Sequence, residues 1–199
     1  MVIVNAKRKD IDAIVNIHLD AFKGFFLTSL GKDFLQFYYS VFLLNKETVF
    51  LCAEDENGNV IGFSAATKVS KGFNSRLIKE NLLSFIALSL KLIFNNPKAL
   101  LRLIKNLTKK SVTIEDDEDY AELYSIGIDS SQQGKGVGKL LLAKTEEALK
   151  SGGVGKVSLT TDYDNNEAAV GFYHSMGYDT LYVFTTYPDR KMYRLIKNL

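Results

Sequence analysis

The sequence predicts a single mixed α/β domain over residues 1–199, and three observations support this fold class. Apolar residues make up 46% of the 199 positions, which is enough for one sizeable core. Segments of strand character alternate with segments of helical spacing along the chain. Only two prolines occur, and no repeat or linker-like stretch divides the chain, so a disordered protein is excluded.

The first part of the chain predicts a strand, two helices and a hairpin. Apolar residues recur at helical spacing after Asp10 and again after Gly31. The turn Glu56-Asn57-Gly58-Asn59 then joins two strand-like segments, because Asn-Gly supplies the positive φ angles of a tight hairpin turn. The predicted elements are a strand at Val2–Ala6, helices at Asp10–Phe22 and about Gly31–Leu44, and strands at Val49–Glu54 and Val60–Val69.

A helical insertion is predicted at about residues 71–119. The segment from about Arg76 to Leu107 is leucine-rich and helical, and Asn95-Asn96-Pro97 divides it, since proline suits the first turn of a new helix. We therefore expect two inserted helices. Their apolar face could roof a substrate pocket, form a homodimer contact or lie on a membrane surface, and packing onto their own domain is favoured.

The rest of the chain alternates strands and helices. The predicted elements are strands at Ala121–Ile128 and Lys156–Thr161, helices at Gly138–Lys150 and Glu167–Ser175, and final strands near Tyr178–Thr186 and Lys191–Ile196.

Charge and cysteine content narrow the function classes. The formal net charge of +2 gives no general attraction to nucleic acid, although Glu80 is the only acid between Lys68 and Lys110. Cys52 is the only cysteine, which excludes an intramolecular disulfide and disfavours a structural zinc site. We expect no metal and no nucleic acid partner.

The location of the protein is predicted from the same features. A single thiol indicates a reducing compartment, and the first ten residues lack the apolar stretch of a secretory signal. The most apolar stretch, Leu82–Phe94, is about 13 residues long and contains Lys91, whereas a membrane span needs roughly 20. A cytoplasmic protein without a transmembrane helix is therefore expected.

The strongest local signal is Gln133-Gly134-Lys135-Gly136-Val137-Gly138-Lys139, between an apolar strand and an apolar helix. Its alternating glycines leave backbone N–H groups unobstructed, and the following helix turns its positive end towards them, so a pyrophosphate site is predicted. A flexible turn without a ligand is the alternative. The spacing fits neither the P-loop nor the dinucleotide fingerprint, where Lys139 would be glycine.

At this point the sequence resembles the N-acetyltransferases of the GNAT superfamily. Their signature, Gln/Arg-x-x-Gly-x-Gly/Ala between a strand and a helix, reads Gln133 to Gly138 here. A second family element, Asn-x-x-Ala-x-x-x-Tyr-x-x-x-Gly-aromatic, appears from Asn166 through Tyr173 to Gly177-Tyr178. The resemblance implies the GNAT fold, a mixed and mostly antiparallel sheet flanked by helices and splayed at the signature strand, with the insertion between the third and fourth strands.

The resemblance also implies acetyl-CoA as cosubstrate, with no metal, in the cleft where the signature strand and the next strand part. The backbone of Ile126, Gly127 and Ile128 would pair with the pantetheine amides. Gly127 would permit that close approach, or a bulge without a ligand. The predicted cofactor-binding residues are Ile126, Gly127, Ile128, Gln133, Gly134, Lys135, Gly136, Val137, Gly138, Lys139, Asn166 and Tyr173.

Two residues match the family's catalytic positions. Tyr173 corresponds to the general-acid tyrosine, since a phenol with a pKa near 10 suits a thiolate of similar basicity; a core aromatic, as expected for Phe172, is the alternative. Glu122 lies where some members carry the base, and period-two alternation puts residues 122, 124, 126 and 128 on one face. It could instead be one more exposed acid. Other candidate proton acceptors are Tyr124, Ser125, Asp162 and a water chain.

Three further polar residues have structural alternatives. Asn166 matches the family asparagine that contacts the cofactor, and it could equally be the N-cap of the next helix. His18 is expected to be packed in a helix or at the surface, and His174 is expected to point away from Tyr173.

The predicted function is transfer of an acetyl group from acetyl-CoA to a primary amine of a small molecule or peptide, by direct attack in a ternary complex. Neither Cys52 nor a motif serine stands where a covalent nucleophile is expected. One alternative is a non-catalytic acyl-CoA sensor, and another is a nucleotide-phosphate protein of a different fold. An anionic acceptor attracted by Arg102 and Lys105 is a further hypothesis.

Overall fold

The computed structural model describes residues 1–95, 116–186 and 189–199, apart from the side chains of residues 89 and 91–95. Within these residues, a seven-stranded sheet has the order β1-β2-β3-β4-β5-β7-β6. All neighbouring strands are antiparallel except β4 and β5, which are parallel. The predicted mixed and mostly antiparallel sheet is therefore confirmed.

The elements follow the predicted order and differ from the expected segments mainly at their ends. The strands are β1 (Val2–Asn5), β2 (Thr48–Glu54), β3 (Val60–Thr67), β4 (Ala121–Ile128), β5 (Lys156–Asp162), β6 (Asp179–Thr186) and β7 (Arg190–Asn198). The helices are α1 (Ile11–Ala21), α2 (Phe26–Ser29), α3 (Lys32–Leu44), α4 (Phe73–Glu80), α5 (Leu82–Asn95), α7 (Val137–Ser151) and α8 (Glu167–Ser175). Short 3-10 helices lie at Arg8–Asp10 and Ser130–Gln132.

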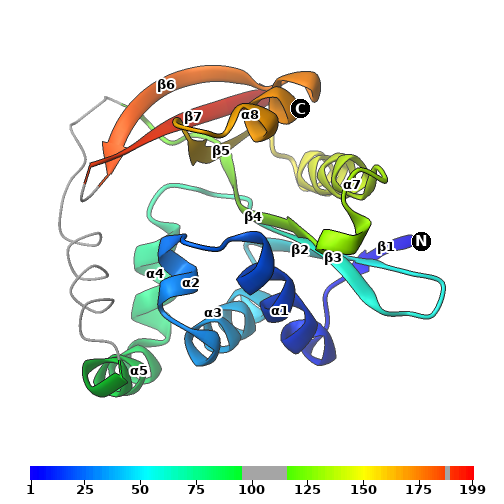
Figure 1. Ribbon diagram of the computed structural model, residues 1–199. Coiled ribbons are helices and arrows are strands. Elements are labelled where there is room, and N and C mark those ends of the chain that lie inside the picture. Colours follow the sequence, from blue (N-terminus) through cyan, green and yellow to red (C-terminus); the bar gives the residue numbers. More distant parts are fainter. Residues whose placement is uncertain (96–115, 187–188) are drawn as a thin grey trace.

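Helices cover both faces of the sheet (Figure 1). The apolar stripes of α1 and α3 pack on one face through residues such as Ile14, Leu35 and Phe42. The stripe of α7 packs on the other face through Leu141 and Leu149. The spacing of these residues is the helical period that predicted the helices, so burial of the stripes explains why they form here.

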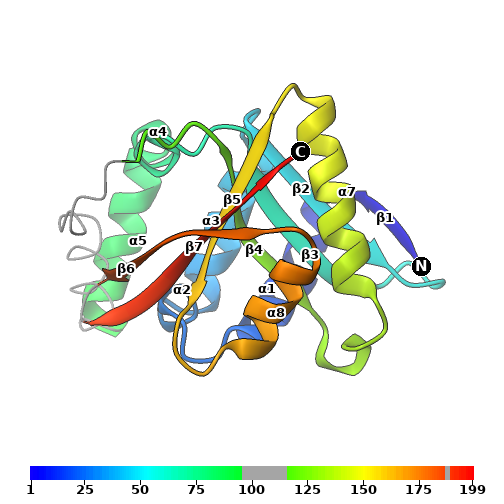
Figure 2. The same cartoon turned by 90° about the horizontal axis from the view of Figure 1, so that it is seen from above.

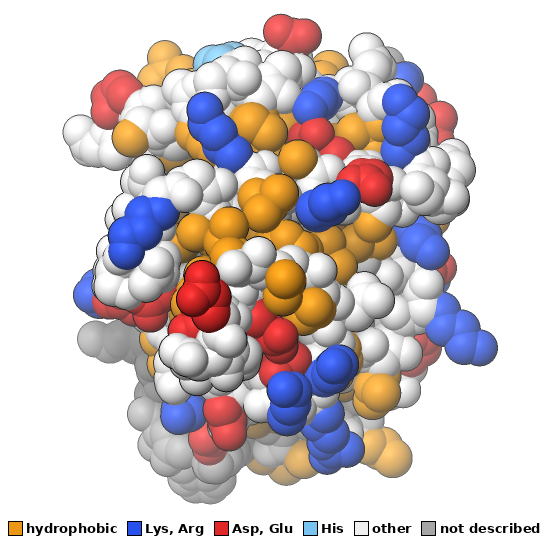
Figure 3. Space-filling view, turned by 90° about the vertical axis from the view of Figure 1, so that its right-hand side faces the viewer, with side chains coloured by type: hydrophobic (Ala, Val, Ile, Leu, Met, Phe, Trp, Pro, Cys, Tyr) orange, Lys and Arg blue, Asp and Glu red, His pale blue; other side chains and the backbone are white. Residues whose placement is uncertain are grey.

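The surface mixes charges of both signs. On the face shown in Figure 3, hydrophobic side chains form a band across the middle, while Lys and Arg side chains are interspersed with Asp and Glu. This distribution agrees with the small formal net charge of +2.

The insertion between β3 and β4 holds two described helices, and the break between them, at Asn81, is one that the sequence pattern did not predict. The chain leaves helical geometry at Asn81, whose side-chain amide donates a 2.9 Å hydrogen bond to the Leu77 carbonyl. An asparagine side chain that bonds a nearby carbonyl competes with helix continuation. Residues 96 and 97 of the break predicted at Asn95-Asn96-Pro97, and the helix predicted to end near Leu107, lie outside the described residues.

Helix α5 packs one side onto the domain and exposes the other. The Phe85 ring contacts the rings of Phe34 and Phe37 at centroid distances of 6.5 and 4.9 Å. Leu83 is 83% exposed, and the large apolar side chains of Leu82, Ile86 and Leu90 are exposed as well. In the view from above, the β6–β7 hairpin extends towards the end of the molecule where α4 and α5 lie (Figure 2).

Strands β4 and β5 separate after a short stretch of pairing. Their only pairs are Ala121 with Val157, Glu122 with Ser158 and Leu123 with Leu159. The next residue, Tyr124, is a bulge in the pairing of β4 with β3, since Ala66 faces Leu123 and Ala65 faces Ser125. A bulge bends its strand, so it explains why β4 turns away from β5 at this point.

The bulge also overturns one expectation about side-chain direction. Tyr124 packs on the α1 and α3 side, whereas Ile126 and Ile128 pack on the α7 side. The prediction that residues 122, 124, 126 and 128 share one face is wrong, because an inserted residue breaks the period-two alternation.

Two other sequence features have structural counterparts. Cys52 lies on β2 with its side chain fully buried, and burial raises the pKa of its thiol to about 12. In the described part of the chain, no helix combines the length and apolar character needed to cross a membrane.

Candidate active site

A cleft of about 520 Å³ opens where β4 and β5 part. It is lined by β4, the glycine-rich loop, the first turn of α7, one side of α8 and the end of α1. The lining residues are Ala21, Phe22, Ile126, Gly127, Ile128, Gln132, Gln133, Gly134, Gly136, Val137, Gly138, Lys139, Ala168, Ala169, Phe172 and Tyr173. The glycine-rich motif and the α8 part of the second motif therefore face one another across a single cleft.

The glycine-rich loop leaves its backbone amides open. Gly134 and Gly136 have φ angles of 76° and 81°, which favour glycine, and a Cβ at either position would meet no atom within 4 Å. Gly136 is also the N-cap of α7, so the positive end of that helix points at the loop. These open amides fit the pyrophosphate of a CoA-type cofactor, since a helix N-terminus favours such an anion.

The two lysines of the motif differ in position. Lys139 is exposed and lines the cleft. Lys135 does not line it, and its Nζ donates a 3.2 Å hydrogen bond to the Gln132 side chain. Of the two, only Lys139 therefore lines the cleft.

Gly127 lines the cleft, but the space beside its Cα belongs to the core. A Cβ there would come within 2.9 Å of Phe63 Cε1 and 3.3 Å of Phe22 Cε2. The bulge of this strand lies at Tyr124, three residues earlier. The close approach that Gly127 permits is therefore that of Phe63 and Phe22, and neither sequence interpretation of this glycine anticipated it.

Tyr173 lies in the cleft wall beside Phe172, with a distance of 5.2 Å between the ring centroids. Burial raises the pKa of Tyr173 to about 12, so its phenol is protonated at neutral pH. In the protein without a bound cofactor, the pKa of the phenol is therefore higher than the value near 10 at which it would match the CoA thiol. The arrangement instead provides a protonated hydrogen-bond donor inside the cleft.

Glu122 does not line this cleft. The Ser70 hydroxyl donates a 2.6 Å hydrogen bond to one of its carboxylate oxygens, and Arg194 donates a 2.6 Å hydrogen bond to the other. The side chains of Glu122 and Arg194 are each only 12% exposed. The alternative that Glu122 is one more exposed acid is therefore wrong.

Asn166 joins the end of β5 to α8. Its side-chain amide donates to the Thr161 hydroxyl at 2.6 Å and to the Asp162 carbonyl at 3.1 Å. It occupies the N-cap position of α8 without a capping hydrogen bond from its side chain, so the N-cap interpretation holds only for its position. It does not line the cleft.

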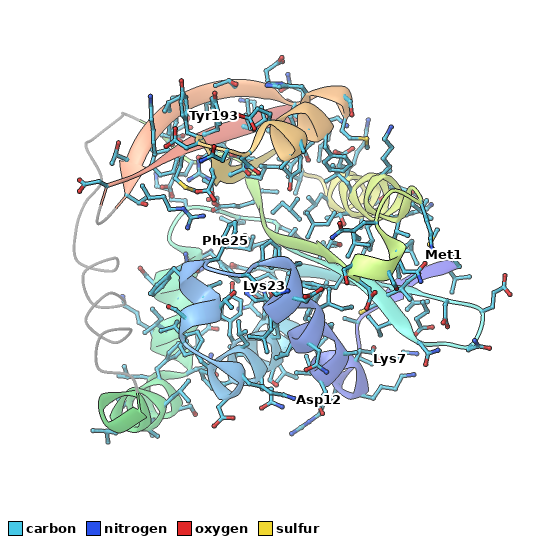
Figure 4. The ribbon with its side chains drawn as sticks, viewed as in Figure 1. Met1, Lys7, Asp12, Lys23, Phe25 and Tyr193 are labelled. Atoms are coloured by element: carbon cyan, nitrogen blue, oxygen red, sulfur yellow. The ribbon has the colours of Figure 1, made fainter. Side chains whose placement is uncertain are left out.

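Asp162, another candidate proton acceptor, forms an ion pair with Arg190. The Arg190 guanidinium also lies over the Phe25 ring, 4.5 Å from its centroid. Figure 4 shows Phe25 between α2 and the layer formed by β5, β6 and β7. The contact between Phe25 and Arg190 therefore connects the segment that leads into α2 with strand β7.

The two histidines lie as expected. His18 is buried, its Nδ1 and the Tyr39 hydroxyl are hydrogen-bonded at 2.7 Å, and burial lowers its pKa to about 4. His174 Nδ1 is bonded to the Tyr178 carbonyl at 2.8 Å, outside the cleft. Among the described residues, no group of His, Cys, Asp and Glu side chains is arranged to hold a metal ion.

Sequence reasoning missed the apolar part of the cleft. Phe22 ends the periodic stripe of α1, and Ala168 is a small residue inside the second motif. The sequence shows Phe22 at the end of an apolar helix and Ala168 within a motif. Only the fold brings the end of α1 to this cleft.

A model of the acetyltransferase (GNAT) family matches residues 11–178, which include every part of the chain that lines the cleft. The chain belongs to this family. The predicted GNAT fold and family membership are thereby confirmed.

Relatives of this GNAT chain in sequence match it over part of its length. Mycothiol acetyltransferase from Rhodococcus erythropolis is 35% identical over 80 residues, which are 40% of this chain and 26% of that protein. The uncharacterised protein YxbD from Bacillus subtilis is 37% identical over 83 residues, 41% of this chain and 50% of its own length. The chain thus spans about a quarter to a half of these relatives.

Solved structures share the fold over almost the whole GNAT chain. The ribosomal-protein-S18-alanine N-acetyltransferase from Escherichia coli has a TM-score of 0.61 at 15% identity, covering 99% of this chain and 92% of that one. The PaiA N-acetyltransferase from Thermoplasma acidophilum, in complex with coenzyme A, has a TM-score of 0.60 at 13% identity, covering 100% and 98%. At these identities the likeness concerns the fold.

Proposed function

We propose that this chain transfers an acetyl group from acetyl-CoA to a primary amine of a small molecule or peptide, by direct attack in a ternary complex. The observation that carries the proposal is the cleft, which combines open loop amides, an unpaired edge of β4 and a protonated tyrosine. The relative from Thermoplasma acidophilum, which has the same fold, was solved with coenzyme A.

The binding residues have separate roles in this proposal. The amides of residues 133–138 hold the pyrophosphate, and Lys139 adds a positive charge beside it. Among the described strands, none pairs with the edge of β4 from Ile126 to Ile128 on the β5 side, so its backbone groups can pair with the pantetheine amides. Bound acetyl-CoA supplies the thioester that the amine attacks.

Tyr173 is proposed as the donor that stabilises the leaving thiolate. Its phenol is protonated and lies in the cleft wall, where a hydrogen bond to developing negative charge favours the transition state. Cys52 lies on β2, away from the cleft-lining residues, which agrees with transfer that forms no covalent enzyme intermediate.

Glu122 is the predicted proton acceptor for the amine, with Tyr124, Ser125, Asp162 and a water chain as alternatives. Ser125 is buried, and Asp162 is paired with Arg190. Each oxygen of the Glu122 carboxylate already accepts a hydrogen bond, and these are the two atoms that would take up the proton of the amine. Glu122 therefore needs a direct test separate from that of Tyr173.

The function is tested by thiol release from acetyl-CoA with a panel of amino sugars, polyamines, amino acids, aminoglycosides and peptide N-termini. With an amine that supports turnover, Tyr173→Phe should lower kcat by about 100-fold or more, as expected for loss of a proton donor, and leave acetyl-CoA binding nearly unchanged. Tyr163→Phe is the matched control, because Tyr163 does not line the cleft.

The alternative of a non-catalytic acyl-CoA sensor predicts a different result. The wild-type protein would then bind acetyl-CoA in calorimetry but release no thiol with any amine of the panel. Equal activity of Tyr173→Phe and the wild type would contradict the role proposed for Tyr173.

A further inference from the structure

The ion pair between Glu122 and Arg194 lies at the point where the sheet divides. Glu122 faces Ser158 in the short parallel ladder of β4 and β5. Arg194, on β7, faces Thr160 in the ladder of β5 and β7. The pair therefore crosses over β5 beside Leu159, the last residue of β5 that pairs with β4.

This pair links two halves of the sheet whose described strands are joined by one short backbone ladder. Beyond the three residue pairs of β4 and β5, the strands β1 to β4 and the strands β5 to β7 have no backbone ladder between them in the described chain. The cofactor cleft lies between these halves, with the loop before α7 on one side and α8 on the other. The angle of the fork therefore sets the width of the cleft.

The surroundings of the pair favour a fixed geometry. Ser70, in the loop between β3 and α4, donates to the second carboxylate oxygen of Glu122 at 2.6 Å. The Arg194 guanidinium lies over the rings of Tyr120 and Phe184, at 5.6 and 6.0 Å from their centroids. With 12% exposure on both sides, the pair is shielded from the solvent that weakens surface ion pairs.

We infer that Glu122 and Arg194 are positioning residues, whose ion pair braces the fork between β4 and β5 and so holds the cofactor cleft at its binding width. The inference rests on the proposed function for the identity of the cofactor. It assigns Glu122 a different role from that of a base, because its charge is used to hold Arg194. Burial and the nearby charge of Glu122 raise the pKa of the adjacent tyrosine, Tyr124.

The experiment compares acetyl-CoA binding in Glu122→Gln, Arg194→Gln and the double variant by calorimetry, with thermal unfolding of each. Both single variants should raise the Kd of acetyl-CoA by about tenfold, because either one removes the brace. The double variant should be no worse than the singles, as expected for residues that act as one unit. Arg194→Lys, which keeps the charge but loses the planar guanidinium, should give an intermediate Kd. If a neutral variant does not fold, the Kd of Arg194→Lys is compared with that of the wild type instead.

Arg76→Gln is the matched control. Arg76 forms a 2.7 Å ion pair with Glu47, but both residues lie on the β1–β4 side of the fork. This variant should leave the Kd of acetyl-CoA unchanged.

A pH profile separates a brace from a base. If Glu122 is a brace, Glu122→Gln lowers kcat/KM but keeps the apparent pKa of the acidic limb, because that limb belongs to the amine. If Glu122→Gln loses the acidic limb and at least 100-fold in kcat while Arg194→Gln binds and reacts like the wild type, the inference is overturned. Failure of the proposed function looks different, since the wild type itself would then release no thiol with any amine.

Discussion

Replacing Gly127 with alanine should destabilise the protein and weaken acetyl-CoA binding, because the added methyl group meets the fully buried ring of Phe63 and the cleft-lining ring of Phe22. The new Cβ would be 2.9 Å from Phe63 Cε1 and 3.3 Å from Phe22 Cε2. Phe63 is fully buried, and its ring lies 5.4 Å from that of Tyr39. Overpacking of this kind costs about 1–3 kcal/mol.

For a chain of this size, each kcal/mol lowers Tm by about 2–4 °C, so Gly127→Ala should lower Tm by about 2–12 °C. Phe22 lines the cleft, and its displacement should raise the Kd of acetyl-CoA in calorimetry. Gly171→Ala is the control, since a Cβ there meets no atom within 4 Å and alanine favours the helix by about 0.5–1 kcal/mol. An unchanged Tm for Gly127→Ala, or an equal loss for Gly171→Ala, would refute this reasoning.

Three smaller perturbations test other parts of the structure. Gly136→Ala forces a side chain into a backbone conformation with φ of 81°, at a cost of about 1–2 kcal/mol, so acetyl-CoA titration should show weaker binding; unchanged affinity would count against the loop geometry. Burial holds the pKa of His18 near 4 instead of 6.5, so the unfolded chain takes up the proton first as the pH falls. The free energy of unfolding should be independent of His18 above pH 6.5 and decrease by about 3 kcal/mol between pH 6.5 and 4. Urea titrations of His18→Gln at several pH values should not show this decrease, and a variant that still shows it would assign the pH dependence to other groups. Ser70→Ala removes one hydrogen bond to Glu122 and should lower the free energy of unfolding in urea by about 1 kcal/mol, whereas no change would show that the bond is weak.

Local patterns in the sequence were sufficient for much of the fold and for one wall of the cleft. β4 and α8 have the predicted bounds, because polar residues or glycines flank each of them in the sequence. The amides around Gly134 and Gly136 depend on neighbouring residues alone, so their exposure could be inferred from the motif.

Features that depend on contacts distant in sequence could not be predicted in this way. The apolar positions of β4 change phase between Leu123 and Ile126, but the pairing with β3 is what identifies this change as a bulge at Tyr124 and decides which face each later side chain occupies. The partner of Glu122 is Arg194, on a strand that no local pattern pairs with it. The need for glycine at position 127 comes from Phe63 and Phe22, which the fold brings there from two other elements.

Burial of Cys52 has a practical consequence for measuring the reaction. The sequence contains one cysteine, its side chain is fully buried on β2, and its pKa is raised to about 12. A thiol-reactive chromogenic reagent needs an accessible thiolate, so the folded protein should consume almost none of it. Released CoA can therefore be followed continuously against a flat background, and slow growth of that background would report unfolding of the enzyme in the same cuvette.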